Sequence, residues 1–277
     1  MTKPGADTVF ISGGFDDLRP IHFRFFNESA KLGKVHALLW SDDVIKKVTG
    51  KLSKFTQEER RYLLEAIRYI HKVTLVNEVN PDALPDSLEF LPRMWVVDDT
   101  NDNPQKKAYC KANGLKYRVL KSENLCLFPD YRPALPKGPS PRKKVIVTGC
   151  YDWFHSGHVR FFEEVSELGD LYVTIGSDET IRELKGEGHP MFPQQQRWFV
   201  VQSIRYVRQA LIATGNGWLD AEPEIYRIKP DIYAVNEDGD RPEKRKFCRE
   251  NGIEYVVLKR LPKPGLPRRQ SKILRGF

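Results

Sequence analysis

The sequence predicts an α/β protein made of two tandem domains, each built on a parallel sheet. Three observations lead to this prediction. The two halves of the 277-residue chain repeat one another in order, a proline-rich segment separates them, and each half alternates short apolar runs with segments of helical spacing. Strands that alternate with helices are typical of parallel sheets wrapped by helices.

The internal repeat is clearest in two stretches that lie 136 positions apart. Residues 15–26 read FDDLRPIHFRFF and residues 151–162 read YDWFHSGHVRFF. Further matches follow in the same order, at offsets of 136 and later 138: Leu32-Gly33 with Leu168-Gly169, Ser41-Asp42 with Ser177-Asp178, Gly50 with Gly186, Pro104 with Pro242, Cys110 with Cys248, Asn113-Gly114 with Asn251-Gly252, and Tyr117 with Tyr255. A fixed order over such a distance indicates a duplicated domain.

The segment between the halves has the composition of a linker. Residues 128–144 read FPDYRPALPKGPSPRKK, with five prolines and several basic residues. Such a segment is extended and semi-rigid. We therefore expect a first domain over 1–135, a linker over 136–143 and a second domain over 144–277.

The first part of the second half predicts two strands and a helix. Residues 145–148 are a β-branched run after a basic cluster, as expected of a buried strand, and a glycine turn follows at Gly149. Residues 159–168 have helical spacing, and Gly169 ends that helix. Residues 171–176 form the next predicted strand.

The remaining elements of this half follow the same alternation. A helix is expected over 194–207, a short strand over 211–213, and a helix over 222–229 that ends before Pro230. The last three predicted elements are a strand over 232–235, a helix over 242–251 stopped by Gly252, and a strand over 254–258. Ligands of such sheets bind at the carboxyl ends of the strands.

Composition narrows the class of protein. No apolar run approaches the roughly 20 residues of a membrane helix, and residues 1–8 carry no apolar signal segment. The four cysteines, at 110, 126, 150 and 248, have neither zinc-site nor disulfide-framework spacing, so a reducing cytoplasm is expected. The net charge of +8 favours an anionic partner, either a polyphosphate ligand or a nucleic acid.

The strongest local motif is His155-Ser-Gly-His158, which follows the strand and turn and opens a helix. A helix N-terminus presents unpaired N–H groups and a partial positive charge, so it binds phosphate well. The two histidines add hydrogen-bond donors for an oxyanion. Gly157 permits close approach to the backbone, and Gly149 and Cys150 bring further main-chain N–H groups alongside.

With these residues the second half resembles the HxGH nucleotidyltransferase superfamily, and more narrowly its cytidylyltransferase-like family. The matching segments are VTGCYDWFHSGHVRFF, IGSDETIRELKGEGHP and QQQRWFVVQSIRYV. The resemblance implies two Rossmann-like nucleotidyltransferase domains. It also implies an enzyme that transfers CMP from CTP to a small phosphorylated or phosphonate acceptor and releases pyrophosphate. Adenylyl transfer from ATP to a sugar phosphate is the first alternative.

The resemblance also assigns roles to particular residues. His155 and His158 would hold the α-phosphate, Lys185 the reacting phosphates, and Asp152 the acceptor or the turn. Arg197 and Arg205 would line the phosphate or acceptor side. The expected nucleotide-binding residues are Gly149, Cys150, Tyr151, Gly157, Asn236, Asp238, Arg269, Ser271 and Lys272. Asn236 replaces a usual glycine of the family, and Lys272 replaces a usual hydroxyl.

The chemistry expected of these residues is positioning and charge neutralisation. The acceptor's phosphate oxygen is already an anion, so its attack on the α-phosphorus needs no strong base. Mg²⁺ would arrive on the triphosphate with its own waters, and no protein metal site is expected.

The first half lacks the same chemical groups. Arg19 and His22 occupy the two histidine positions, Pro20-Ile21 replaces Ser-Gly, and Thr49 stands in place of Lys185. We therefore predict a catalytically inactive copy that forms a pseudo-dimer with the second half inside one monomeric chain.

Two other classes of protein remain open. The changes at Asn236 and Lys272 are compatible with a nucleotide-binding regulator without catalysis. The basic linker and the basic residues after Lys259 suggest a nucleic-acid module. No aromatic interleaving or known nucleic-acid motif accompanies those residues, which disfavours that hypothesis. We expect no membrane partner.

Overall fold

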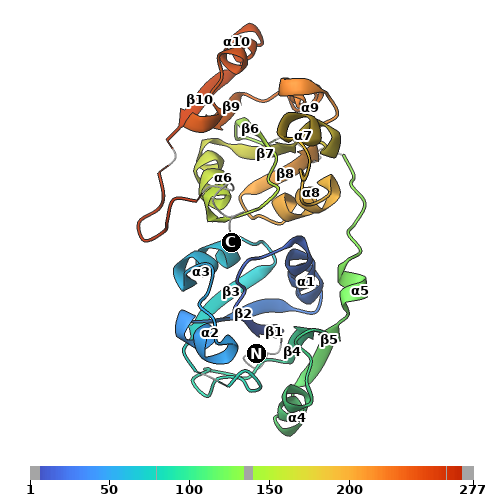
Figure 1. The fold of residues 1–277 in the computed structure, drawn as a ribbon, viewed down its shortest axis with the longest axis vertical. Helices are drawn as coiled ribbons and strands as arrows, with labels where there is room; N and C mark the ends of the chain where they lie inside the picture. The colour runs from blue at the N-terminus through green and yellow to red at the C-terminus, as the bar shows by residue number, and fades with distance from the viewer. Residues whose placement is uncertain (1–6, 79, 134–139, 260, 270–277) are drawn as a thin grey trace. The chain divides into compact units, whose positions relative to one another are not determined.

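The computed structural model describes residues 7–78, 80–133, 140–259 and 261–269. The chain divides into two compact units, Met1–Phe128 and Pro129–Phe277. The N-terminal unit is coloured blue to green in Figure 1, and the C-terminal unit green to red. Each unit holds one five-stranded sheet in which all the paired strands are parallel.

The N-terminal unit alternates strands and helices throughout. Its sheet has the order β3-β2-β1-β4-β5. The elements are β1 (Thr8–Gly13), α1 (Pro20–Ala30), β2 (Lys34–Trp40), α2 (Asp42–Thr49), α3 (Gln57–Glu65), β3 (Ile70–Val76), β4 (Met94–Asp98), α4 (Pro104–Ala112), β5 (Lys116–Leu120) and α5 (Ser122–Leu125).

The C-terminal unit has the same connectivity, with the sheet order β8-β7-β6-β9-β10. Its elements are β6 (Lys144–Gly149), α6 (Ser156–Leu168), β7 (Asp170–Ile175), α7 (Asp178–Lys185), α8 (Gln194–Gln202), β8 (Val207–Ile212), the 3-10 turn η1 (Gly217–Leu219), α9 (Glu222–Ile228), β9 (Ile232–Asn236), the 3-10 turn η2 (Glu237–Gly239), α10 (Pro242–Glu250) and β10 (Glu254–Leu258). The predicted Rossmann-like α/β fold is therefore confirmed for both units.

Side chains that alternate along the strands supply both faces of the C-terminal sheet. Ile146 on β6 and Tyr233 on β9 belong to a buried cluster with Ile225 of α9 and Cys248 of α10. The opposite alternation, such as Val145 and Val147, is buried as well. A sheet covered on both faces explains why its strands read as continuous apolar runs.

The centre of the sheet opens toward its carboxyl edge. Strand β6 pairs with β7 over six positions, but with β9 only at Val145↔Ile232 and Ile146↔Tyr233. Beyond those positions β6 and β9 are not paired. Since the strand order reverses here, this is the topological switch point at which open α/β sheets bind ligands.

Two boundaries differ from the sequence prediction. The helix expected over 194–207 ends at Gln202, and β8 already begins at Val207. Val200, Val201 and Ile204 are buried and keep the helical spacing through the turn after α8. The end of α8 therefore cannot be recognised from the spacing of apolar residues. Helix α7 was not predicted as a helix, although its sequence belongs to a segment that matches the family. The Ser177 side chain caps α7 by accepting the Thr180 N–H.

The proline-rich segment begins inside the C-terminal unit. The Tyr131 hydroxyl accepts the Ile212 N–H at 3.1 Å, and its ring contacts Trp198 edge-on at 5.4 Å. Gln195 donates to the Pro129 carbonyl at 2.8 Å. The segment thus covers the outer edge of β8, and residues 134–139 of the expected linker lie outside the described residues.

In the described part of the chain, no helix has the length and apolarity needed to cross a membrane.

Candidate active site

Two histidines cap the first turn of α6. His155 is the N-cap residue, and its Nδ1 accepts the Gly157 N–H at 3.1 Å. The Nδ1 of His158 accepts the His155 N–H at 3.4 Å, and the two rings stack with their centroids 3.9 Å apart. Because Nδ1 accepts in both rings, the proton of a neutral imidazole lies on Nε2. Each Nε2 is then a hydrogen-bond donor of the kind a phosphate oxygen needs.

Gly157 is required by the packing of this turn. A Cβ at this position would lie 2.9 Å from the His155 ring and 3.4 Å from the Arg269 carbonyl oxygen. Any larger residue would therefore displace the His155 ring. This contact explains the glycine of the motif without reference to a ligand.

The turn after the first strand of each unit, β1 or β6, has the same backbone strain. Tyr151 has φ 52°, and Phe15 of the N-terminal unit has φ 47°. Left-handed backbone at a residue with a large side chain costs about 1–2 kcal/mol. Tyr151 packs its ring against His158 and Phe162, as Phe15 packs against Phe26. The strain therefore belongs to the fold of the turn and not to the histidine motif alone.

Arg197, expected at the phosphate or acceptor side, is instead an internal cross-link. Its side chain is 1% exposed, and its guanidinium donates to the carbonyls of Cys150 and Gly176 and to Asp178. Arg60 of the N-terminal unit makes the equivalent bonds to Gly14, Trp40 and Asp42. An arginine that ties together the carboxyl ends of β6 and β7 in one unit, and of β1 and β2 in the other, serves the fold.

Arg205, the second arginine expected at that side, is not brought to the site. It is exposed in the turn between α8 and β8, directly before β8 begins. The strands are parallel, so this turn lies at the amino edge of the sheet, opposite to the histidines. Helical spacing in the sequence around Arg205 could not predict at which edge of the sheet this residue would lie.

Asp152 holds the loop that precedes α8. Its Oδ1 accepts the N–H groups of Met191 at 2.7 Å and Phe192 at 3.0 Å. Asp16 holds the matching loop by accepting the Lys54 N–H with Oδ2 and the Phe55 N–H with Oδ1. Orientation of the turn, one of the two roles expected for Asp152, is thus seen in both units.

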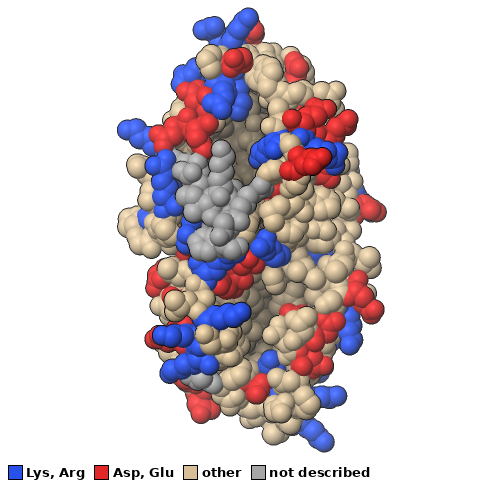
Figure 2. Space-filling view, in the orientation of Figure 1, with Lys and Arg blue, Asp and Glu red and all other residues tan. Residues whose placement is uncertain are grey.

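A large cavity joins most of the expected residues at the switch point. It has a volume of about 770 Å³ at the carboxyl end of β6, and Figure 2 shows this face of the C-terminal unit as hollowed, with basic side chains along part of the border. Pockets of 300–1,000 Å³ are typical of small-ligand sites. The expected residues that line it are Gly149, Cys150, Tyr151, Asp152, His158, Lys185, Asn236 and Asp238.

The cavity also has walls that the sequence analysis missed. Arg241 and Lys244 line it from the start of α10, and Leu184 and His189 line it from the α7 side. Lys244 donates to the Gly239 carbonyl at 3.3 Å, much as Lys106 donates to Asn101 in the N-terminal unit at 2.8 Å. Arg241 immediately precedes α10, which begins with Pro242. That position, at the start of a helix after a strand, was the sequence signal that could have identified Arg241 as a residue of the site.

Charge in the cavity acts on Cys150. Burial raises the pKa of its thiol, while the positive charges of Lys185 and Arg197 lower it in smaller measure. The Lys185 amine is therefore close to the turn after β6. Nothing in these contacts activates the thiol as a nucleophile.

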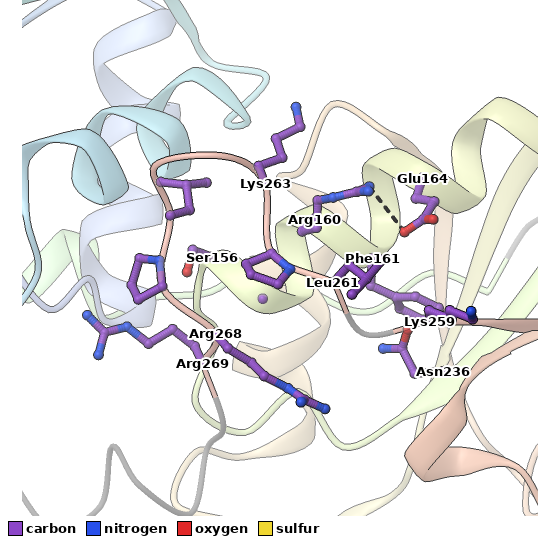
Figure 3. A pocket seen from close by; sticks show the side chains of 14 residues that line it. Ser156, Arg160, Phe161, Glu164, Asn236, Lys259, Leu261, Lys263, Arg268 and Arg269 are labelled. Atoms are coloured by element: carbon purple, nitrogen blue, oxygen red, sulfur yellow. Dashed lines mark ion pairs between the residues drawn. The ribbon is translucent and has the colours of Figure 1, made fainter.

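The C-terminal segment passes across the start of α6. Arg269 lines a pocket of about 30 Å³ beside Ser156 and Gly157, and Figure 3 shows the segment alongside this helix. Lys263 pairs with Glu163 at 2.5 Å, and Arg268 pairs with Glu237 at 3.2 Å. Ser271 and Lys272, expected to bind phosphates, lie outside the described residues.

Among the described residues, no three His, Cys, Asp or Glu side chains come together as candidate metal ligands. With Nδ1 of both histidines accepting a backbone N–H, the groups that remain around this turn are Nε2–H, backbone N–H and amine donors, which suit phosphate oxygens. This is the donor set of an enzyme that acts on nucleotide phosphates.

Comparison with known proteins agrees with that class. The model of the family described as cytidylyltransferase-like matches residues 146–259, which include the histidine motif, the cavity walls and β10. The chain belongs to the cytidylyltransferase-like family and is a nucleotidyltransferase.

Several similar curated proteins carry one name. The FAD synthase of Ferroglobus placidus is 36% identical over 42% of this chain and 75% of its own length. The FAD synthase of Pyrococcus horikoshii is 39% identical over 45% of this chain and 84% of its own length. A crystal structure of the lipopolysaccharide core biosynthesis protein from Thermoplasma volcanium covers 46% of this chain and 98% of its own, at 22% identity and a TM-score of 0.37.

Proposed function

We propose that this enzyme transfers AMP from Mg²⁺-ATP to a phosphorylated acceptor, with flavin mononucleotide (FMN) as that acceptor, and releases pyrophosphate. The observation that carries the nucleotidyl transfer is the pair of stacked imidazoles at the start of α6, beside a cavity of about 770 Å³. The names of the similar FAD synthases support ATP as the donor and FMN as the acceptor.

The reaction needs orientation more than proton transfer. An acceptor phosphate oxygen attacks the α-phosphorus, the bond from that phosphorus to the bridging oxygen breaks, and pyrophosphate leaves with the electron pair. The Nε2–H groups of His155 and His158 and the N–H groups of the first turn of α6 stabilise the negative charge on the α-phosphate oxygens. Arg269, which lines the small pocket beside the start of α6, would neutralise the leaving phosphates in this proposal.

Mg²⁺ enters as part of the nucleotide substrate. It would be held by triphosphate oxygens and its own waters, as is usual for Mg²⁺ at phosphates. Asp152 has its Oδ1 occupied by two backbone N–H groups, so it is a poor direct ligand for the ion.

The mouth of the cavity supports an acceptor with an apolar part. Leu184 lines the cavity and its side chain is 58% exposed. An exposed leucine at a ligand site is a contact surface for an apolar group, such as a fused ring system.

CTP is the second candidate donor, since the matched family is described as cytidylyltransferase-like. Transfer of CMP to a small phosphorylated or phosphonate acceptor would use the same histidine turn. The two candidate donors differ in the base of the nucleotide. The residues proposed to contact the base are Asn236, which ends β9, and Asp238 in the turn η2.

The test combines nucleotide binding and product release. Thermal shift with Mg²⁺ and each of ATP, CTP, GTP and UTP identifies the donor, and a His155→Ala/His158→Ala variant is the control. A shift with ATP, together with pyrophosphate release on addition of FMN, is the expected result. A shift with CTP alone selects the second candidate, and no shift with any nucleotide rejects nucleotidyl transfer by this chain.

A further inference from the structure

Comparison of the two units separates the contacts of the fold from those of the site. Asp152 and Asp16 hold their loops through the same pair of backbone N–H groups, and Arg197 and Arg60 make the same cross-links. A feature that the active unit alone possesses is a candidate for chemistry. Such a feature appears on the α7 side of the cavity.

His189 is the distinctive residue there. Its Nδ1 lies 3.6 Å from Oδ2 of Asp152, whose side chain is 4% exposed. His189 lies two positions before Met191, and the residue two positions before the matching Lys54 is Leu52, which is 78% exposed. The loop therefore keeps its anchor in both units, but only the C-terminal unit places an imidazole against the anchoring carboxylate.

Lys185 accompanies His189 in the C-terminal unit alone. Lys185 ends α7 and lines the cavity, whereas Thr49 ends α2 and donates to the Ile45 carbonyl at 2.8 Å. An amine and an imidazole four residues apart thus face the same cavity. A buried carboxylate beside the imidazole orients its ring toward the cavity wall.

The cavity contains two sets of side chains that can donate hydrogen bonds to an anion. His158, Arg241 and Lys244 come from α6 and α10, while Lys185 and His189 come from the segment after β7. Strand β6 lies between β9 and β7, so the two sets approach the cavity from opposite sides. The proposed reaction brings two anions together, a triphosphate and an acceptor phosphate, and each anion needs its own neutralising groups.

We propose that Lys185 and His189 form the binding site for the acceptor's phosphate, with Asp152 as the positioning residue of His189. This rests on the proposed function and deepens it, because it makes a phosphomonoester the recognised part of the acceptor. The triphosphate occupies the other side, at the start of α6. Asp152 then has two tasks, to anchor the loop through Oδ1 and to orient the imidazole through Oδ2.

The first test measures binding of inorganic phosphate, which carries the recognised group whatever the rest of the acceptor is. Phosphate is titrated calorimetrically into full-length protein that is saturated with Mg²⁺ and α,β-methylene ATP. His189→Ala should weaken phosphate binding by about tenfold, the value of a charged hydrogen bond. His189→Arg should restore most of that loss, because it returns a positive charge and donors.

The matched control is His71→Ala, which removes an exposed histidine from β3 of the N-terminal unit. It should bind phosphate as the unchanged protein does. Equal phosphate affinity in the unchanged protein and His189→Ala overturns the proposal, and so does the absence of any phosphate binding to the unchanged protein.

The second test is kinetic and separates this inference from the proposed function. With ATP and FMN, His189→Ala should raise the KM for FMN about tenfold and leave the KM for ATP unchanged. An unchanged KM for FMN contradicts the inference. Failure of the unchanged protein to release pyrophosphate, while phosphate binding still depends on His189, rejects the proposed function and leaves the phosphate site standing.

Discussion

At the scale of single residues, comparison of the two units acts as an internal control. Arg60 and Arg197 carry equivalent hydrogen bonds, as do Asp16 and Asp152, so these residues build the turn at the carboxyl ends of the central strands. His155 is different, because Arg19 takes its place in the other unit. His155, Gly157 and Lys185, which the proposed function uses, are positions at which the two units differ.

Replacement of His158 by alanine should lower kcat by about a hundredfold or more. The physical reason is the loss of one donor to the charge that develops on the α-phosphate, for which removal of an oxyanion donor is the precedent. Pyrophosphate release under saturating donor and acceptor is the measurement. Near-normal turnover would remove the histidine from the mechanism.

His22→Ala is the matched control for that variant. The Nδ1 of His22 accepts the Arg19 N–H at 2.7 Å, so the change removes the same local hydrogen bond from the N-terminal unit, which is predicted to be inactive. It should leave kcat unchanged. A comparable fall in rate from both variants would mean that His158 acts through stability alone.

Asp220 predicts a pH dependence of stability. Burial, and next the nearby carboxylate of Glu224, raise the pKa of Asp220 to about 6, while Lys244 and Arg197 oppose the rise. A raised pKa means that the folded state binds the proton more tightly than the unfolded state. Stability therefore falls as the pH rises from about 4 to about 6, and the cost is absent below that window.

Asp220→Asn should accordingly raise the free energy of unfolding by about 1–2 kcal/mol at pH 7.5, after allowance for solvent screening, and change it little at pH 4. Urea unfolding at the two pH values is the measurement. Asp130→Asn, at an exposed position, is the control that should have no effect at either pH. Equal effects of Asp220→Asn at both pH values would contradict the prediction.

At the scale of elements, the site depends on where pairing between strands stops. Strands β6 and β9 pair at two positions only, and the cavity opens beyond them. Helix α6 then begins at this opening with its capping histidines, and α7 and α10 supply the cationic walls. The proline-rich segment adds a further contact, at the opposite edge strand β8.

Tyr131→Ala should lower the free energy of unfolding of the C-terminal unit by about 2 kcal/mol, because it removes the ring contact with Trp198 and the acceptor for the Ile212 N–H. Tyr131→Phe keeps the ring and should cost about 1 kcal/mol. Denaturant unfolding followed by tryptophan fluorescence is the measurement. No loss in either variant would show that the segment contributes nothing to the unit.

At the scale of the whole molecule, the chain contains two units with one strand order. A common origin of the units and a pseudo-dimeric arrangement stay predictions. The predicted consequence is a monomer in solution, because a fused second copy can supply the interface that a partner chain would otherwise provide.

Light scattering coupled to size exclusion should therefore give a mass of about 32 kDa, that of one 32.1 kDa chain. The measurement is made at several protein concentrations, since association depends on concentration. A stable dimer or larger oligomer at the lowest concentration would contradict the prediction.

Much of the fold was predictable because local sequence and periodicity determine it. Short β-branched runs predicted the central strands, Gly169 and Gly252 marked the ends of two helices, and the matches at an offset of 136 predicted a second unit with the same order of elements. The histidine motif was also readable, because its chemistry lies within four consecutive residues. Boundaries such as that of α8 were lost where helical spacing ran on through a turn.

The sequence by itself therefore determined the fold class, the two-part organisation and the nucleotidyl-transfer motif, all of which depend on near neighbours along the chain. Only the tertiary structure decided which distant residues share the cavity. It buried Arg197, left Arg205 at the far edge of the sheet, and brought His189 to Asp152 across 37 positions of sequence. The physical reason is that spacing along the chain fixes a side chain's direction within one element, while strand order and turn geometry fix which elements meet.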